Sequence, residues 1–327
     1  MNPIVYDNLA LMAEYEFRFG GSQRLLSAVS KRLKKEVYII GNNKNPDPIW
    51  DIKPIYGIPE EPIIFSIVVD KYKLRTFYRK EHIKFCHSGT SLENFVDNIQ
   101  AKEINWLTHR KRVYDFWNLK GFNIDLIRNG YIVYDKLKLE ETPSKRDQGI
   151  FISRICPDKC PDIAIDVFQN TGIPLYLAGN NELVEYVSFL KDEPKGEDII
   201  FVPPNINLEI DLITRDRLLA ESKVLVHCSN GGIHDYLEYS ILDGLIFNCI
   251  PLCITKDIDQ FSIINEKCFG RVVNNIEEAE NALKDIIDNY EYYVIQSRIF
   301  MNNFLKNQNN LWDRWDSKLR ELCSALI

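Results

Sequence analysis

The sequence predicts an α/β protein with two doubly wound parallel sheets, each of the Rossmann type. Short apolar runs alternate with amphipathic segments along almost the whole chain, and this alternation is typical of strand–helix–strand units. The length of 327 residues exceeds what one hydrophobic core usually holds, so two domains of about 150 residues each are expected. A polar segment that contains Pro143 separates the two halves and has the composition of a linker.

The candidate strands are short, apolar and bounded by polar or turn-forming residues. In the first half they are residues 37–40, 63–69, 83–86, 104–107 and 125–127. In the second half they are residues 149–152, 175–178, 199–202, 224–227 and 251–254. The candidate helices are residues 22–34, 235–246, 277–289 and 311–327, the last with a tryptophan pair. Tryptophans near a terminus usually dock a helix on the body of the protein.

These elements predict four segments along the chain. They are an N-terminal Rossmann-like domain at 1–140, a linker at 141–148, a C-terminal Rossmann-like domain at 149–306 and a docking helix at 307–327. Open parallel sheets bind ligands at the carboxyl ends of their strands. We therefore expect the ligand where the strand ends of the two sheets face each other.

The composition excludes several classes of protein. A content of 45% hydrophobic and 27% charged residues is ordinary for a soluble globular protein, and a net charge of −7 argues against a large nucleic-acid footprint. No apolar run reaches the roughly 18–20 residues of a membrane span, and the first residues lack the pattern of a signal peptide. The eight cysteines are scattered without zinc-ligand spacing, which favours reduced thiols, a cytoplasmic location, no metal site and no cofactor.

The strongest functional signal is the segment FISRICPDKCPDIAID, which begins at Phe151. An apolar strand runs into a loop with Arg154 and Lys159, and an amphipathic helix follows. Two cations at a strand-to-helix junction suit a diphosphate, and the N–H groups and dipole of the helix also favour anions there. The alternative interpretation is a solvated Arg and Lys in a surface loop.

A second signal is a glycine-rich loop between a buried strand and a helix. The loop contains Gly231 and Gly232, and Asp235 is a good N-cap for the helix. Asp235 and Asp243 are eight residues apart, which places both on nearby positions of one helix face. Together with Glu238 they offer carboxylates that accept hydrogen bonds from sugar hydroxyls. Alternatively these are solvated helix acids, an interpretation that suits Glu238 better than the aspartates.

Further candidates are a glycine pair and three histidines. Gly20 and Gly21 directly precede a helix, where backbone can approach a ligand closely, although a tight turn explains the pair equally well. His87 and His109 each follow an apolar strand of the first domain, and His87 can face the cleft. His234 lies beside the glycine loop, where it can touch a phosphate. The alternative for His87 is a histidine that caps a strand or is solvated.

In this order the motifs resemble those of the GT-B glycosyltransferases, specifically the retaining family 4 type. The N-terminal half has a GG loop with a basic first turn (Gly20, Gly21 and Arg24) and an NG pair (Asn129 and Gly130). The C-terminal half has two cations that match the residues binding the donor diphosphate (Arg154 and Lys159) and a glycine at a strand end (Gly179). The E-x7-E motif and its following turn are matched by Asp235, Asp243, Asn248 and Pro251. The match extends over both halves of the chain, so it concerns the whole fold.

The sequence departs from the family pattern at several of these positions. Ser153, Cys160 and Asn248 stand where the family has glycine, and both acids of the E-x7-E motif are aspartates. A second register, in which Glu238 is the second acid, keeps one true glutamate. That register puts the proline of the turn five residues too far along the chain, so we prefer Asp235 and Asp243.

The resemblance implies a hexosyltransferase that uses a nucleotide-diphosphate sugar, with retention and without metal. The residues implied to act in the reaction are Arg154, Lys159, Asp235 and His87. Those implied to bind the donor are Gly20, Gly21, Gly179, Gly231, Gly232, His234, Glu238 and Asp243. In this scheme Asp243 faces the donor's ribose and Asp235 lies near the transferred sugar.

Several alternatives stay open on the sequence. The acceptor can be a glycan, a lipid-linked glycan, a protein or a modified DNA base. A nucleotide-sugar epimerase of the same fold and a catalytically inactive GT-B binding or scaffold protein are the rival functions. Residue usage rich in Ile, Asn and Lys hints at a small-genome or viral source.

Overall fold

The computed structural model describes part of the chain, and it divides the chain into two compact units. The described residues are 4–7, 37–40, 52–55, 64–67, 83–86, 102–103, 105–108, 111–127, 146–169, 171–179, 183–192, 197–203, 212–230 and 237–324. One unit comprises Met1–Ile132 together with Lys306–Ile327, and the other comprises Val133–Leu305. We call them the N-terminal and the C-terminal unit and describe each by itself.

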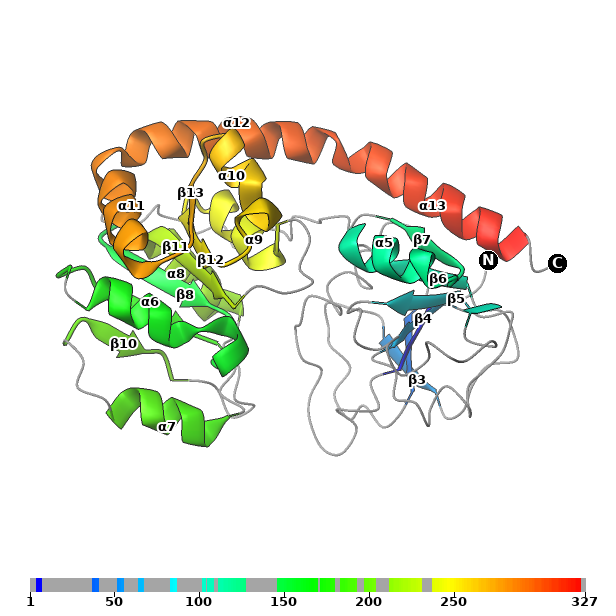
Figure 1. Ribbon diagram of the computed structural model, residues 1–327, viewed down its shortest axis with the longest axis horizontal. Coiled ribbons are helices and arrows are strands. Elements are labelled where there is room, and N and C mark those ends of the chain that lie inside the picture. The colour runs from blue at the N-terminus through cyan, green and yellow to red at the C-terminus, as the bar shows by residue number, and fades with distance from the viewer. Residues whose placement is uncertain are drawn as a thin grey trace. The chain divides into compact units, whose positions relative to one another are not determined.

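The N-terminal unit contains a seven-stranded sheet in which all neighbouring strands are parallel (Figure 1). Its strand order is β3-β2-β1-β4-β5-β6-β7. The strands are β1 (Ile4–Asp7), β2 (Val37–Ile40), β3 (Ile52–Ile55), β4 (Ile64–Ile67), β5 (Ile83–Cys86), β6 (Asn105–Thr108) and β7 (Ile124–Leu126). Helix α5 (Lys111–Leu119) connects the last two strands and buries Trp117 against Phe122. The order reverses between β1 and β4, as in doubly wound folds.

Helix α13 (Gln308–Ser324) belongs to the N-terminal unit although it ends the chain. Trp315 is only 2% exposed, and the Nζ atom of Lys318 lies 2.9 Å from the Oδ2 atom of Asp125 in β7. Burial of a tryptophan on one face and an ion pair to a strand of the sheet together fix the helix to this unit.

The C-terminal unit contains a second parallel sheet, of six strands, in the order β10-β9-β8-β11-β12-β13. The strands are β8 (Gln148–Ile152), β9 (Leu175–Ala178), β10 (Ile199–Phe201), β11 (Ser222–Ser229), β12 (Ile250–Thr255) and β13 (Arg271–Val273). Strand order reverses between β8 and β11, and the carboxyl ends of these two central strands therefore define the expected ligand position. Both sheets confirm the predicted α/β class with doubly wound parallel sheets.

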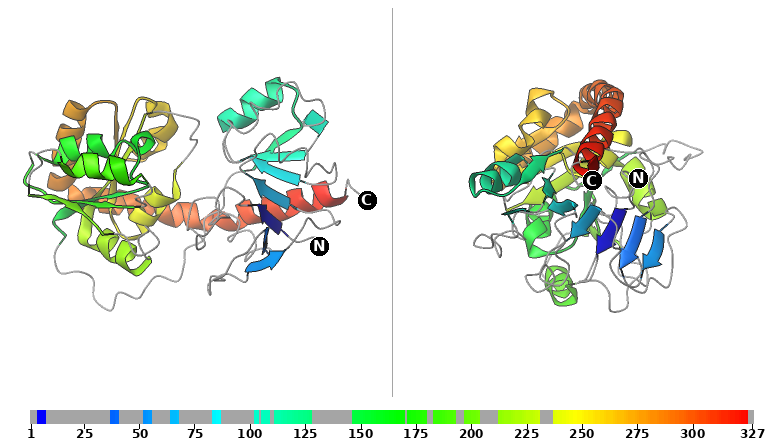
Figure 2. Two further views of the ribbon diagram at one scale, coloured as in Figure 1. Left: turned by 90° about the horizontal axis from the view of Figure 1, so that it is seen from below. Right: turned by 90° about the vertical axis from the view of Figure 1, so that its right-hand side faces the viewer.

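Helices cover both faces of this second sheet (Figures 1 and 2). Helix α6 (Pro161–Phe168), helix α7 (Val184–Asp192) and helix α11 (Ile276–Asp288) share one core with alternate residues of the strands, among them Val224 and Val226. Side chains alternate along a strand, so Leu225 and His227 point to the other face, which α8 (Leu212–Glu221) and α9 (Tyr239–Ile246) cover. The remaining elements are η2 (Pro157–Lys159), η3 (Ile258–Phe261), α10 (Ser262–Glu266) and α12 (Tyr290–Lys306).

The helix that the sequence predicted from Asp235 begins four residues later. Helix α9 starts at Tyr239, and Glu238 is its N-cap with an extended backbone (φ −67°, ψ 154°). The prediction that Asp235 caps this helix is therefore wrong, because the helix begins at Tyr239 and Glu238 is its cap; Asp235 itself lies outside the described residues. At the other end of α9, Asn248 has a φ of 58°, a left-handed conformation that Asn tolerates, at the position where the resembled family has glycine.

Three strands are additional to those that the sequence predicted: β1, β3 and β13. The strand predicted at 224–227 also extends further at both ends, from Ser222 to Ser229. The helix predicted at 22–34 lies outside the described residues. Within the described part of the chain, no helix combines the length and the apolar character that a membrane crossing requires.

Candidate functional site

The first part of the candidate site is the loop after β8, which carries Arg154. The loop crosses the end of β9, where the backbone N–H of Ser153 donates to the carbonyl of Ala178 at 3.2 Å. A Cβ atom at Gly179 would lie 1.6 Å from the carbonyl oxygen of Ser153, so only glycine fits there. The Gly179 position thus lets the loop pass directly over the strand end, with Arg154 exposed on it.

A tight turn then presents Lys159. Pro157 opens the short helix η2, and Cys160 adopts a left-handed conformation with a φ of 44° before Pro161 opens α6. The N–H of Cys160 donates to the carbonyl of Pro157 at 3.1 Å, which closes the turn. Both prolines fix their backbone φ, so the position of Lys159 between them is well defined.

Lys159 meets the N-cap of α9 at this edge of the sheet. Its Nζ atom lies 3.0 Å from Oε1 and 3.3 Å from Oε2 of Glu238. The two side chains are 12% and 24% exposed, so the ion pair is largely shielded from water. The interpretation of Glu238 as a solvated helix acid is therefore wrong: the carboxylate points to Lys159, and no capping hydrogen bond uses it.

His227 completes this group from β11. Its Nε2 atom lies 3.9 Å from Oε1 of Glu238, beyond hydrogen-bond distance, and this buried atom has no hydrogen-bond partner among the described residues. The imidazole packs edge-on against the ring of Phe261, with ring centres 5.3 Å apart. Burial lowers the pKa of His227, the Glu238 carboxylate opposes this shift and the Lys159 ammonium adds to it, so the ring is neutral at pH 7.

A second ion pair lies between α8 and α9. Arg215 of α8 donates to Asp216 at 2.6 Å and to Asp243 of α9 at 3.4 Å. The Asp243 side chain is 6% exposed and that of Arg215 is 15% exposed. The Asp243 carboxylate is therefore buried and forms an ion pair with Arg215.

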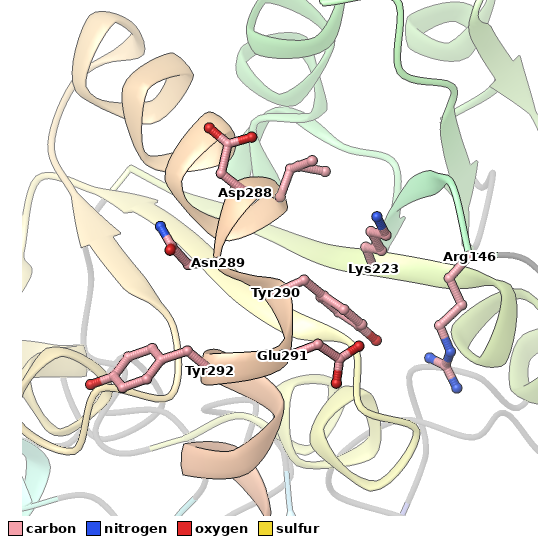
Figure 3. A pocket seen from close by; sticks show the side chains of 8 residues that line it. Arg146, Lys223, Asp288, Asn289, Tyr290, Glu291 and Tyr292 are labelled. Carbon is pink, nitrogen blue, oxygen red and sulfur yellow. The ribbon is translucent and has the colours of Figure 1, made fainter.

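A hollow lies at the opposite end of the strands. It has a volume of about 650 Å³ and is lined by Arg146 and Lys223 from the strand side and by residues of the α11–α12 junction such as Tyr290 (Figure 3). Arg146 donates to the carbonyl oxygens of Phe247 and Ser222, so its guanidinium satisfies backbone acceptors next to α9 and at the start of β11. This hollow is at the amino ends of β8 and β11, away from the edge where doubly wound sheets bind ligands.

The structure brings several of the predicted site residues to one edge of the C-terminal sheet. Arg154, Lys159, Gly179 and Glu238 lie there, and Asp243 lies in the neighbouring helix α9. The other predicted site residues fall outside the described residues: Gly20, Gly21, His87, Gly231, Gly232, His234 and Asp235. Within the described part of the chain, no cluster of three or more His, Cys, Asp or Glu side chains is placed to hold a metal ion.

The sequence reasoning missed two residues of this arrangement, His227 and Arg215. A histidine inside an otherwise apolar, buried parallel strand was the available signal for His227, since a buried polar group needs a reason. Arg215 has no local sequence signal, because its partner Asp243 is far along the chain.

Comparison with solved structures identifies the fold. Over 97% of this chain and 99% of the other, the structure resembles TarM of S. aureus, a mutant of which was solved with fondaparinux, α-GlcNAc-glycerol and UDP, at 11% identity and a TM-score of 0.63. WaaG, a glycosyltransferase involved in lipopolysaccharide biosynthesis, matches at 11% identity and a TM-score of 0.64 over 95% of this chain and 99% of its own. The T4 phage BGT, solved with UDP and Mn²⁺, matches at 11% identity and a TM-score of 0.56 over 97% of this chain and 99% of its own.

The chain thus has the GT-B fold of these glycosyltransferases, with two Rossmann-like domains, and the predicted fold resemblance is confirmed. No protein-family model and no curated protein sequence matches the chain. The identities are low, and they establish the fold alone.

Proposed function

We propose that this protein is a glycosyltransferase that moves a sugar from a nucleoside-diphosphate sugar to an acceptor. The observation that carries the proposal is the pair of cations, Arg154 and Lys159, at the carboxyl edge of the C-terminal sheet, beside the point where strand order reverses. Two proteins with this fold, TarM and the T4 phage BGT, were solved with UDP, which supports a uridine nucleotide as the first candidate donor.

In this proposal the two cations neutralise the charge that develops on the departing diphosphate. Such donors act in the transition state, and the N-terminus of α6 adds partial positive charge to the same edge. The absence of a side chain at Gly179 leaves the Arg154 loop close to the strand end, where backbone can reach the phosphates.

The remaining roles follow the sequence resemblance and stay proposals. Asp243 contacts the ribose, Asp235 lies near the transferred sugar and His87 serves the acceptor side. Gly20, Gly21, Gly231, Gly232 and His234 contact the donor. We further propose retention of the anomeric configuration, no metal requirement and a cytoplasmic location. The acceptor is of one of four classes: a glycan, a lipid-linked glycan, a protein or a modified DNA base.

The test is release of free nucleoside diphosphate from a panel of nucleoside-diphosphate sugars. We expect one donor to be hydrolysed slowly without an acceptor, and the Arg154→Ala and Lys159→Ala variants to release product about 100-fold more slowly. Lys223→Ala is the matched control, because it removes a cation at the opposite end of β11, and it should keep the wild-type rate. No release from any donor by the wild type would instead indicate an inactive binding protein of the same fold.

A further inference from the structure

Lys159, which we expect to bind a diphosphate, already forms an ion pair with a carboxylate at the candidate site. Both carboxylate oxygens of Glu238 lie within 3.3 Å of the Nζ atom of Lys159. A buried cation that is held by a carboxylate attracts a second anion only weakly, because the two charges cancel at short range. A donor diphosphate at Lys159 therefore requires Glu238 to move away from the lysine.

His227 lies where it can receive the displaced carboxylate. The Nε2 atom of His227 is buried, has no hydrogen-bond partner in the described part of the chain and lies 3.9 Å from Oε1 of Glu238, the same oxygen that Lys159 holds at 3.0 Å. A shift of about 1 Å brings the Glu238 oxygen into hydrogen-bond range of an Nε2–H donor. Leaving a buried polar atom unpaired is costly, so His227 retains an unused interaction.

The main chain at Glu238 is held independently of its carboxylate. Its extended N-cap backbone and its carbonyl, which accepts from the N–H groups of Ile241 and Leu242, keep the main chain in place. Its side chain makes no capping hydrogen bond and can change rotamer without unwinding α9. His227 is fixed by contrast, because it lies within β11 and packs against Phe261, which is fully buried.

We propose that His227 is a positioning residue for Glu238. It donates a hydrogen bond to the Glu238 carboxylate when a donor diphosphate binds Lys159. This inference rests on the proposed function, because it needs an anion at Lys159. Glu238 then has two positions, one on Lys159 before the donor binds and one on His227 once the donor is bound. The exchange moves no covalent bond, and it presents Lys159 to the diphosphate with its full charge.

The exchange has a consequence for protons. Among the described residues, the titratable groups facing the His227 ring are Glu238 from the N-cap of α9, Lys159 from η2 and Cys253, its register partner on β12. Burial raises the pKa of the Cys253 thiol, which keeps it neutral. When Glu238 approaches the ring and the diphosphate cancels the charge of Lys159, both changes raise the pKa of His227, so donor binding favours proton uptake by the ring.

The first experiment tests the exchange without any ligand, by NMR titration of the His227 ring. Lys159→Met removes the cation that holds Glu238, and we expect the pKa of His227 to rise by about one unit or more. In the Lys159→Met/Glu238→Gln double variant the rise should disappear. A rise that persists in the double variant reflects only the loss of the nearby lysine charge and overturns the proposal, as does no rise at all.

The second experiment tests the donor-driven step, by calorimetric titration of UDP in buffers of different ionisation enthalpy. On binding UDP, the wild type should take up more protons than His227→Gln, whose side chain keeps an amide donor but cannot be protonated. Protons released by the phosphate of UDP are common to both proteins, so they drop out when the two values are subtracted. His227→Leu, which has no donor, should bind UDP about tenfold or more weakly. Tyr290→Phe, which loses a partly buried hydrogen bond elsewhere in the unit, is the folding control and should match the wild type.

The two failures can be told apart. If the wild type binds UDP and Arg154→Ala weakens binding, but His227→Leu and His227→Gln match the wild type in affinity and protons, the role of His227 is wrong and the proposed function stands. If the wild type does not bind UDP or any other nucleoside diphosphate, the proposed donor site is wrong. The proposed role of His227 is then wrong as well.

Discussion

At the scale of single residues, the site depends on a glycine that no side chain can replace. A Cβ atom at Gly179 would meet the carbonyl of Ser153 at 1.6 Å, a backbone contact that cannot rotate away. We expect Gly179→Ala to destabilise the protein by about 2–4 kcal/mol, since the overlap forces the backbone to shift. Urea denaturation measures this change.

The matched control for that substitution is Gly172→Ala. Gly172 has a positive φ of 67°, but a Cβ atom added there would meet no atom of the described residues within 4 Å, so the cost should be about 1 kcal/mol. Equal costs for the two variants would show that the close approach at Gly179 is not what requires glycine. Gly179→Ala should also lower donor turnover, because the displaced loop carries Arg154.

His227 gives the stability of the protein a defined dependence on pH. Its pKa is lowered in the folded state by burial, so between the folded pKa and the unfolded value of about 6.5 the unfolded chain binds more protons. Stability is therefore complete above about pH 6.5 and falls as the pH drops below it, by up to about 1.4 kcal/mol per pH unit. Urea midpoints measured from about pH 7.5 to pH 5.5 should show this fall in the wild type.

The His227→Gln variant isolates this contribution from that of the other histidines. Its stability should depend less on pH over the same range, because the amide does not titrate. Identical slopes for the two proteins would contradict the assignment of a buried, neutral imidazole at this position.

At the scale of elements, the sequence missed one central strand, β1, and two edge strands, β3 and β13. Strands β2, β5 and β9 have the predicted bounds, because an apolar run flanked by polar residues marks a buried parallel strand. Strand β3 contains Pro54, which argues against a strand unless it lies at an edge, and β3 is the edge strand. Strand β13 has three residues and lies at the other sheet's edge, which leaves almost no pattern to recognise.

The start of α9 explains why the acidic residues were only partly predictable. A sequence with acids at 235, 238 and 243 offers several N-caps, and local propensity favours Asp over Glu. The observed cap is Glu238, whose side chain serves a tertiary ion pair with Lys159 that has no local signature. The pairing of two loops across a sheet edge follows from topology, which spacing along the chain does not encode.

Helix α13 should stabilise the N-terminal unit and leave the C-terminal unit unaffected. Trp315 is buried, so Trp315→Ala should cost about 3–5 kcal/mol. Hydrogen exchange should show faster exchange in the sheet of β1 to β7 and unchanged protection in β8 to β13. Glu321→Ala, at a largely exposed position of the same helix, should change stability by less than about 0.5 kcal/mol. Faster exchange confined to residues 133–305 would contradict the assignment of α13.

At the scale of the whole molecule, the proposal implies catalysis without a metal ion. Arg154 and Lys159 supply the positive charge that a divalent cation supplies elsewhere, so turnover should survive an excess of EDTA. The comparison is informative because a neighbour of the same fold was solved with Mn²⁺. Loss of turnover in EDTA that Mn²⁺ or Mg²⁺ restores would contradict this part of the proposal.

The central claim is that the carboxyl edge of the C-terminal sheet binds the donor diphosphate, and a UDP titration tests it most directly. The measurement compares the dissociation constants of the wild type, Arg154→Ala and Lys223→Ala by calorimetry. Arg154 and Lys223 lie at opposite ends of the strands, and each variant removes one cation. We predict that Arg154→Ala weakens UDP binding about tenfold or more while Lys223→Ala binds as the wild type does. Weaker binding by Lys223→Ala with Arg154→Ala unchanged would place the nucleotide in the hollow at the amino ends of the strands and contradict the account.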